Sequence, residues 1–248
     1  MNNKIRIGNF TSSEVVALMS KDRSGKGPGK PYFSYIEEKN MERKLGRACN
    51  DISAHVARAL TWGTLLQSRV FHLLGEPYQE CDETLIHPTI DCWVGTPDGF
   101  NTNDEKAVVE VKCPMTLKSF CTLVNAWEKG GIEAIRDKHD SGEKYFWQCI
   151  SNAVLTNSRY AELIVYCPKK SELEAIKELA SSAAEIGLDT KWIYWAPENE
   201  LPFIPDSSTY NSMNKMRFEV TYAMKAALHV TIQNAAKELI ERPVLQPA

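Results

Sequence analysis

The 248-residue sequence lacks the features that would mark a membrane, secreted or zinc-binding protein. No apolar run approaches the roughly 18–20 residues that a membrane span needs, and the first ten residues lack the apolar stretch of a signal peptide. The 7 cysteines form no CxxC pair, and the 5 histidines show neither HxH nor HxxxH spacing. Disulfide frameworks, iron–sulfur clusters and zinc sites therefore have no support, and we expect an intracellular protein with reduced thiols and no membrane partner.

The chain as a whole also lacks a large excess of charge of one sign, although two of its segments carry opposite excesses. The net charge of -3 argues against a strongly basic protein that coats nucleic acid. Residues 1–50 nevertheless hold ten Lys and Arg against five Asp and Glu, whereas residues 76–110 hold nine Asp and Glu against Lys106 alone. These segments are either ordinary solvated faces or an anion-binding region beside a cation site, and composition does not choose between the two.

Apolar periodicity along the chain predicts an α/β protein in which helices flank a central mixed sheet. Helices are expected at about 31–75, 116–128, 131–139, 143–157, 171–186 and 208–241, after a short first helix that starts near 11–14. Strands are expected at 85–94, 107–112, 162–167 and 191–195. No repeat or low-complexity linker divides the chain, so we interpret residues 1–248 as one domain with a C-terminal helical extension at about 208–241.

The segment 107–112 reads Ala-Val-Val-Glu-Val-Lys, and alternation along a strand puts Glu110 and Lys112 on one face. Asp98 lies twelve residues before Glu110, so a hairpin would bring the two carboxylates together. Adjacent carboxylates repel each other unless a cation lies between them, and their oxygens suit Mg²⁺ or Mn²⁺. Such a cation beside a lysine suits phosphodiester hydrolysis. By itself, however, the bare pattern is weak and favours a surface salt bridge.

Further segments make the pattern specific. Thr96-Pro97-Asp98-Gly99 followed by Val109-Glu110-Val111-Lys112-Cys113-Pro114 resembles the active-site hairpin of the PD-(D/E)xK nucleases, in particular the lambda-exonuclease and YqaJ-like recombinase group of phages. The other matching segments keep the order of that family: residues 8–26, Leu60-Thr61-Trp62-Gly63, residues 131–135 and Tyr145-Phe146-Trp147-Gln148. The resemblance covers about residues 6 to 165, and the last third of the chain adds little to it.

The resemblance implies a restriction-endonuclease-like core and a 5'-to-3' exonuclease that requires Mg²⁺ or Mn²⁺ and acts on double-stranded DNA ends. It further implies a phage or prophage protein in the cytoplasm of a bacterial host that supplies single strands for recombination. The expected partners are DNA ends, a single-strand annealing protein and further copies of the chain in a homotrimer.

The same resemblance assigns roles to individual residues. Asp98 and Glu110 would be metal ligands together with the backbone carbonyl of Val111, and Lys112 would be the catalytic lysine. Gln148 would be an accessory residue near the nucleophilic water. The DNA 5'-phosphate would be bound by three further residues, Arg23, Thr96 and Lys118. An arginine suits this role because its guanidinium donates two charge-assisted hydrogen bonds.

One position departs from the family pattern. Where the family has a helical glutamate that contributes to the metal site, this chain has Gln67. An amide removes one negative charge from the metal environment, so we expect weaker metal binding unless Asp91 or Glu80 compensates. The alternatives are a slow enzyme, a DNA-end-binding protein that has lost catalysis, and a structure-specific DNA endonuclease.

Overall fold

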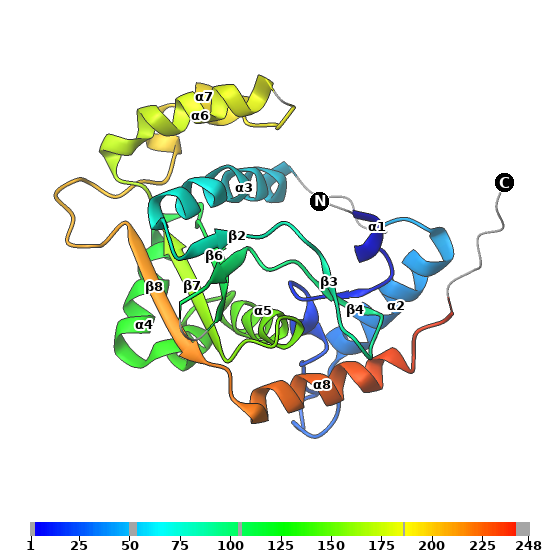
Figure 1. Ribbon diagram of the computed structural model, residues 1–248. Helices are drawn as coiled ribbons and strands as arrows, with labels where there is room; N and C mark the ends of the chain where they lie inside the picture. Colours follow the sequence, from blue (N-terminus) through cyan, green and yellow to red (C-terminus); the bar gives the residue numbers. More distant parts are fainter. Residues whose placement is uncertain (1–2, 50–53, 104–105, 186, 242–248) are drawn as a thin grey trace.

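Two segments rich in β-branched residues form the two central strands of the main sheet, β6 (Ala107–Lys112) and β7 (Tyr160–Tyr166). They are parallel, in a register that runs from Ala107 opposite Tyr160 to Lys112 opposite Val165. Parallel neighbours need a crossover connection, which helices α4 (Leu117–Lys138) and α5 (Gly142–Leu155) supply. The computed structural model describes residues 3–49, 54–103, 106–185 and 187–241 (Figure 1).

The main sheet has the order β2-β5-β6-β7-β8. The added strands are β2 (Tyr78–Glu80), β5 (Gly99–Asn101) and β8 (Met213–Glu219). Each of these pairs antiparallel with its neighbours, so only the β6–β7 pair is parallel. The predicted mixed sheet with flanking helices is therefore confirmed.

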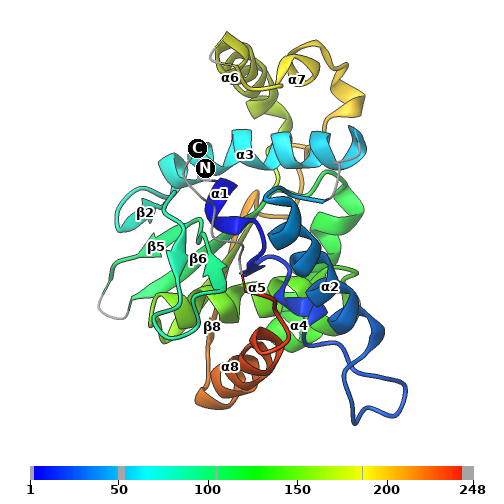
Figure 2. The same ribbon diagram turned by 90° about the vertical axis from the view of Figure 1, so that its right-hand side faces the viewer.

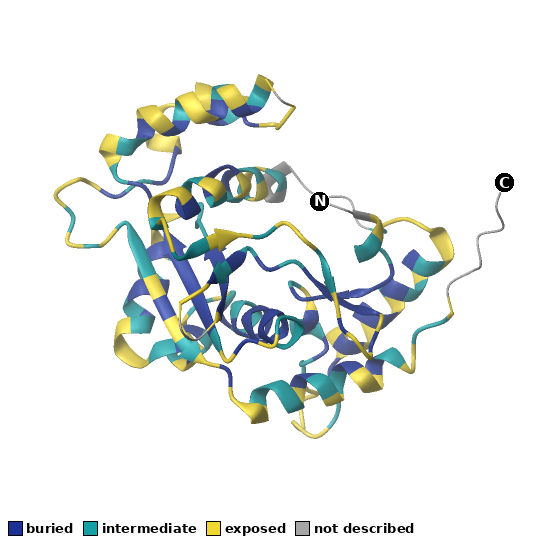
Figure 3. Ribbon diagram, viewed as in Figure 1, coloured by how far each residue is buried: buried dark blue, intermediate teal, exposed yellow. Residues whose placement is uncertain are grey.

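Helices cover both faces of this sheet, because its central strands are apolar on both sides. Val108 and Leu163 pack in one buried cluster with residues of α4, α5 and α8 (Tyr222–Ala236). Val109 and Ile164 pack in a second cluster with α3 (Ala54–Leu74) and α6 (Leu173–Glu185). Figures 1 and 2 show α3 and α6 on the side of the sheet opposite to α4, and Figure 3 shows the central strands as buried.

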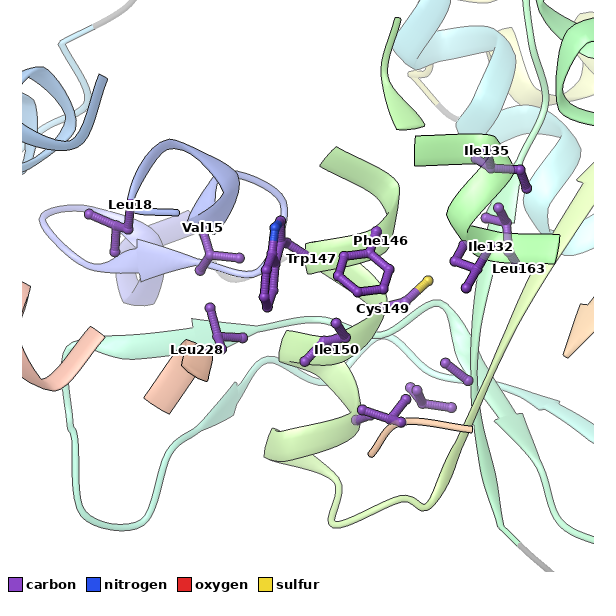
Figure 4. Packing of buried hydrophobic residues seen from close by; sticks show 14 of the residues in the cluster. Val15, Leu18, Ile132, Ile135, Phe146, Trp147, Cys149, Ile150, Leu163 and Leu228 are labelled. Atoms are coloured by element: carbon purple, nitrogen blue, oxygen red, sulfur yellow. The ribbon is translucent and has the colours of Figure 1, made fainter. Parts of the chain in front are cut away.

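Helix α5 is the centre of the first cluster. Its residues 146, 147, 149, 150 and 153 are all buried. In Figure 4, Phe146 and Ile150 of α5 lie between Val15 and Leu228 on one side and Leu163 on the other. Because α5 is packed on several sides, the side chains that it projects toward the sheet are held in fixed positions.

The helix pair predicted at 116–128 and 131–139 is one element with a kink. Gly130 and Gly131 leave helical geometry inside α4, and Gly131 has φ of 64°. Such a positive φ favours glycine, which explains why the helix changes direction at the Gly-Gly pair.

A smaller sheet has the order β1-β4-β3, from β1 (Phe10–Thr11), β4 (Trp93–Gly95) and β3 (Leu85–Ile86). The single strand predicted at 85–94 is therefore wrong, because the chain reverses between Ile86 and Trp93. The N–H of His87 donates to the carbonyl of Trp93, and Pro88 has no N–H to continue a ladder.

The strand predicted at 191–195 is also wrong, because this segment is helix α7 (Lys191–Trp195). Only Ile193 of its Lys-Trp-Ile-Tyr-Trp run is buried, and Trp195 is 77% exposed, so the aromatic residues do not line one buried face of a strand. A helix that starts at 208 is likewise wrong, because its first third is β8, which pairs with β7. Met216 and Phe218 pack on the core at strand spacing, whereas the Met213–Met216 interval resembled a helical one.

The remaining elements are short or peripheral. They are α1 (Asn3–Arg6), the 3₁₀ helix η1 (Val15–Ala17), α2 (Lys30–Leu45), and the 3₁₀ helices η2 (Lys170–Glu172) and η3 (Glu198–Glu200). None of the described helices combines the length and the apolar character that a bilayer span requires.

Candidate functional site

A cavity of about 1100 Å³ lies where the carboxyl end of β6 meets helices α3, α4 and α5. Its wall includes eight of the nine residues predicted to form a site: Asp98, Glu110, Val111, Lys112, Gln148, Gln67, Thr96 and Lys118. Ligand sites in α/β proteins commonly lie at the carboxyl ends of strands, and this cavity lies at such an end.

Asp98, Glu110 and Lys112 converge, but the hairpin that joins them is formed by β5 and β6 and not by the predicted strand 85–94, which contributes β4 to the smaller sheet. Gly99 of β5 lies opposite Val109 of β6, which brings the turn residue Asp98 to the level of Glu110. Oδ2 of Asp98 accepts a hydrogen bond from the backbone N–H of Val111 at 2.7 Å. The ammonium of Lys112 donates to Oε1 of Glu110 at 2.6 Å, and only 3% of the Glu110 side chain is exposed. A buried carboxylate is thus paired with a lysine and faces a second acid.

Helix α5 contributes two amide side chains that contact Glu110 and Lys112. The amide Nε2 of Gln148 donates to Oε1 of Glu110, and Nδ2 of Asn152 donates to Oε2 at 3.1 Å. The ammonium of Lys112 also donates to Oε1 of Gln148 at 3.3 Å. Gln148 and Asn152 are four residues apart, so they lie on the same face of the helix. Asn152 is not among the predicted site residues, although its spacing of four from Gln148 indicates a shared helix face.

The charges of the cluster shift the pKa values of its members. Enclosure by the protein and the nearby carboxylate of Glu110 raise the pKa of Asp98 to about 8. Desolvation disfavours the charged form of Lys112, but attraction to Glu110 and Asp98 outweighs it and raises the lysine pKa above its usual range. Lys112 is therefore an ammonium at neutral pH, and a second negative charge, on Asp98 beside Glu110, is disfavoured.

The donor set fits a hard divalent cation. Asp98, Glu110 and the carbonyl of Val111 offer oxygen ligands only, and Mg²⁺ usually takes one or two carboxylates and keeps several waters. Among the described residues, no group of three or more His, Cys, Asp and Glu side chains is placed to hold a metal. The raised pKa of Asp98 shows that ionising both acids is costly without a cation, and a bound cation would remove this cost.

Gln67, the departure from the family pattern, lies on α3 in the cavity wall. Its Nε2 donates to Oε1 of Glu80 at 3.3 Å, and the hydroxyl of Ser68 donates to the same oxygen at 2.9 Å. Glu80 pairs with Gly99 in the β2–β5 ladder, beside Asp98. Asp91 is exposed and does not line the cavity. Of the two acids named as compensating groups, the structure places Glu80 next to Gln67.

The predicted phosphate-binding residues are only partly together. Thr96 and Lys118 line the cavity, and the hydroxyl of Thr96 is 2.9 Å from that of Thr84. Arg23 lies in an exposed loop outside the cavity wall. Arg6 lines the cavity instead, and its Nη2 donates to the hydroxyl of Ser13 at 3.2 Å. Arg6 belongs to the basic first segment of the chain, but its position before β1 gave no reason to single it out.

Gly95 closes the cavity wall where β4, η1 and α5 meet. A Cβ on this glycine would overlap the hydroxyl of Ser12 and would lie 2.7 Å from Oδ1 of Asn152. The Ser12 hydroxyl is 2.8 Å from that of Ser151, which also accepts the indole N–H of Trp93 at 2.8 Å. Close backbone approach at residue 95 therefore brings the N-terminal segment against α5.

The sheet order and the position of the acid pair define a restriction-endonuclease-like fold. No protein-family model matches the sequence, and no curated protein matches it. Solved structures do match the fold. The alkaline exonuclease LHK-Exo from Laribacter hongkongensis aligns with a TM-score of 0.57 at 19% identity, over 94% of this chain and 88% of that one.

Two further structures are similar over nearly the whole chain. LHK-Exo in complex with dAMP aligns with a TM-score of 0.57 at 19% identity, over 95% of this chain and 90% of that one. A phage-related exonuclease from Haemophilus somnus 129PT aligns with a TM-score of 0.59 at 12% identity, over 93% of this chain and 92% of that one. The chain thus has the fold of these exonucleases, including the part beyond residue 165.

Proposed function

We propose that this protein is a divalent-metal-dependent exonuclease that degrades double-stranded DNA from its ends in the 5'-to-3' direction. The observation that supports it most is the convergence of Asp98, Glu110 and Lys112 in a cavity of about 1100 Å³. The likeness of the fold to solved exonuclease structures supports the same conclusion.

The roles of the residues follow from their contacts. Asp98, Glu110 and the Val111 carbonyl would hold Mg²⁺ or Mn²⁺, which supplies Lewis-acid polarisation of a phosphodiester and a water of lowered pKa when bound. The ammonium of Lys112 neutralises charge that develops on the phosphate, because its raised pKa keeps it protonated. Gln148 donates to Glu110 and accepts from Lys112, so it holds both groups in one orientation.

The phosphate of the DNA end is assigned to cations and hydroxyls around the cavity. Thr96, Lys118 and Arg6 line it. The sequence resemblance assigns Arg23 to the same phosphate, but Arg23 lies outside the cavity wall, so we assign this role to Arg6 in its place. By the same resemblance we propose a homotrimer that works with a single-strand annealing protein in phage-type recombination, in the cytoplasm of a bacterial host.

The purified chain tests the enzymatic function directly. With Mg²⁺ or Mn²⁺ it should shorten linear duplex DNA, whereas Asp98→Ala and Lys112→Ala should slow degradation by about 100-fold or more. Lys170→Ala is the matched control, because this exposed lysine pairs with Glu198 outside the cavity. Strand-specific end labels give the polarity. Equal degradation by wild type and both site variants would contradict the proposal.

Gln67 motivates a second candidate, a DNA-end-binding protein with weak or no turnover. Its amide meets Glu80 where a carboxylate would add charge to the metal site. Tight DNA binding without degradation by the wild type, together with nuclease activity in Gln67→Glu, would favour this candidate. Cleavage of covalently closed circles would instead indicate a structure-specific endonuclease.

A further inference from the structure

Ser119 and His139 form a hydrogen-bonded pair on the wall of the cavity. Ser119 lies in the first turn of α4, and His139 follows the last residue of the same kinked helix. The Ser119 hydroxyl oxygen is 2.8 Å from Nε2 of His139, and both residues line the cavity. Neither residue has a role in holding the acid pair.

The contacts of His139 decide which atom donates. Nδ1 of His139 accepts a hydrogen bond from the backbone N–H of Ser141 at 3.1 Å, so the ring proton lies on Nε2. Nε2 therefore donates to the oxygen of Ser119. This tautomer leaves His139 unable to take a proton from Ser119, which excludes a serine nucleophile activated by this histidine.

The hydroxyl proton of Ser119 is left without a protein acceptor among the described residues. The serine oxygen accepts from Nε2 of His139, which fixes the position of the hydroxyl. The backbone N–H of Ser119 donates to the hydroxyl of the N-cap residue Thr116, which fixes the start of the helix that carries the serine. The free O–H is thus an oriented donor in the cavity wall.

The histidine is itself held in place. Its ring stacks on that of Tyr145, with centroids 5.6 Å apart and an angle of 28°, and the ammonium of Lys112 lies 5.1 Å from the centre of the Tyr145 ring. Burial lowers the pKa of His139, against a smaller opposing effect of Asp140, which favours the neutral ring. Ser119, His139, Tyr145 and Lys112 therefore form one continuous wall.

The charges on this wall suit an anion. Lys118, next to Ser119, has no ion-pair partner among the described residues, whereas Lys138 and Lys144 are paired with Asp137 and Glu14. A hydroxyl donor beside an unpaired ammonium is a usual arrangement for contact with the phosphates of a nucleic acid strand.

We propose that Ser119, oriented by His139, donates a hydrogen bond to a phosphate oxygen of the DNA strand in the cavity. Ser119 is a substrate-binding residue, and His139 is a positioning residue that acts through it. The inference rests on the proposed function only in taking DNA as the ligand, and it concerns binding and not the chemical step.

Equilibrium binding tests this subsite without turnover. Fluorescence anisotropy of a labelled duplex, with Ca²⁺ in place of Mg²⁺, compares Ser119→Ala with wild type; the expected loss of affinity is about five- to tenfold. His139→Phe keeps the stacked ring and removes the hydrogen-bond donor, so its affinity for the duplex should fall about threefold or more. His139→Gln restores an N–H near Nε2 and should bind within about twofold of wild type. Ser182→Ala, on α6 and outside the cavity, should bind as wild type does.

Neutral methylphosphonates placed one at a time along the strand identify the phosphate. At the contacted position, Ser119→Ala should cause no further loss, and the number of that position separates a terminal from an internal phosphate. Equal affinities of Ser119→Ala and Ser182→Ala for DNA would overturn the subsite. It would also be overturned if Ser119→Ala still lowered the affinity with a methylphosphonate at each position in turn. If the wild type binds through Ser119 but degrades no DNA, the subsite stands and the exonuclease function fails.

Discussion

The side chain of Asp98 is bound to the backbone of Val111, the residue that separates Glu110 from Lys112. One carboxylate therefore fixes the turn before β5 to the strand that carries the other acid and the lysine. The contact leaves Asp98 beside Glu110, where burial and like charge raise its pKa.

Asp98→Asn should abolish turnover yet reduce the pH dependence of stability. The folded protein holds the Asp98 proton up to about pH 8, whereas the unfolded chain releases it near 3.8, so the wild type loses stability as pH rises between these values. The asparagine cannot ionise, and its oxygen can still accept from Val111. The free energy of unfolding should be measured by urea denaturation in EDTA at pH 5.5 and 8.5. Between these pH values the wild type should lose about 1 kcal/mol or more of this free energy beyond what the variant loses. Equal losses would contradict the assignment.

Asn152→Ala should impair the site more than the fold. Loss of the hydrogen bond to Oε2 leaves the buried Glu110 with one donor fewer, which should cost about 1–3 kcal/mol of unfolding free energy. The misplaced carboxylate should lower kcat at saturating DNA by about tenfold or more. Asn125→Ala removes a partly buried amide that accepts from Tyr210 outside the cavity, so its kcat should equal that of wild type. Similar kcat values for both variants would show that Asn152 does not position Glu110.

The pair Gln67 and Glu80 should set the metal requirement. Gln67→Glu adds a negative charge to the cavity, so the Mg²⁺ concentration for half-maximal degradation should fall several-fold. Glu80→Gln should raise that concentration if Glu80 compensates for the amide. Asp91→Asn changes an exposed acid outside the cavity wall and should have no effect. A Glu80→Gln titration that coincides with that of Asp91→Asn would remove Glu80 from the site.

Arg6 and Arg23 should differ in their effect on the DNA end. Arg6 lines the cavity and Arg23 does not, so Arg6→Ala should reduce the preference for a 5'-phosphorylated over a 5'-hydroxyl duplex by about tenfold, while Arg23→Ala retains it. The ratio of kcat/KM on the two substrates measures this preference. A loss confined to Arg23→Ala would restore the role that the sequence resemblance suggests.

Local sequence predicted the part of the site that depends on one hairpin. Strand alternation put Glu110 and Lys112 on the same face, and the register of β5 with β6 brings Asp98 to them. The Gly-Gly break in α4 and the central strand β7 were also readable, because glycine and β-branched residues act locally.

What the sequence did not reveal depends on contacts between distant segments. Asn152 and Arg6 reach the cavity only because α5 packs on β6 and the N-terminal segment packs on α5. The sequence predicts helix where β8 forms because the pairing of β8 with β7 spans about fifty residues of sequence. It predicts a strand where α7 forms because the aromatic run at 191–195 does not show that only Ile193 is buried.

Because Gly95 has no Cβ, it lets two neighbouring segments of the chain approach each other closely. A single methyl group there would separate the segment that carries Ser12 from the helix that carries Asn152. The spacing between these two segments beside the cavity therefore depends on the absence of a side chain at residue 95, a position that takes no part in the chemistry.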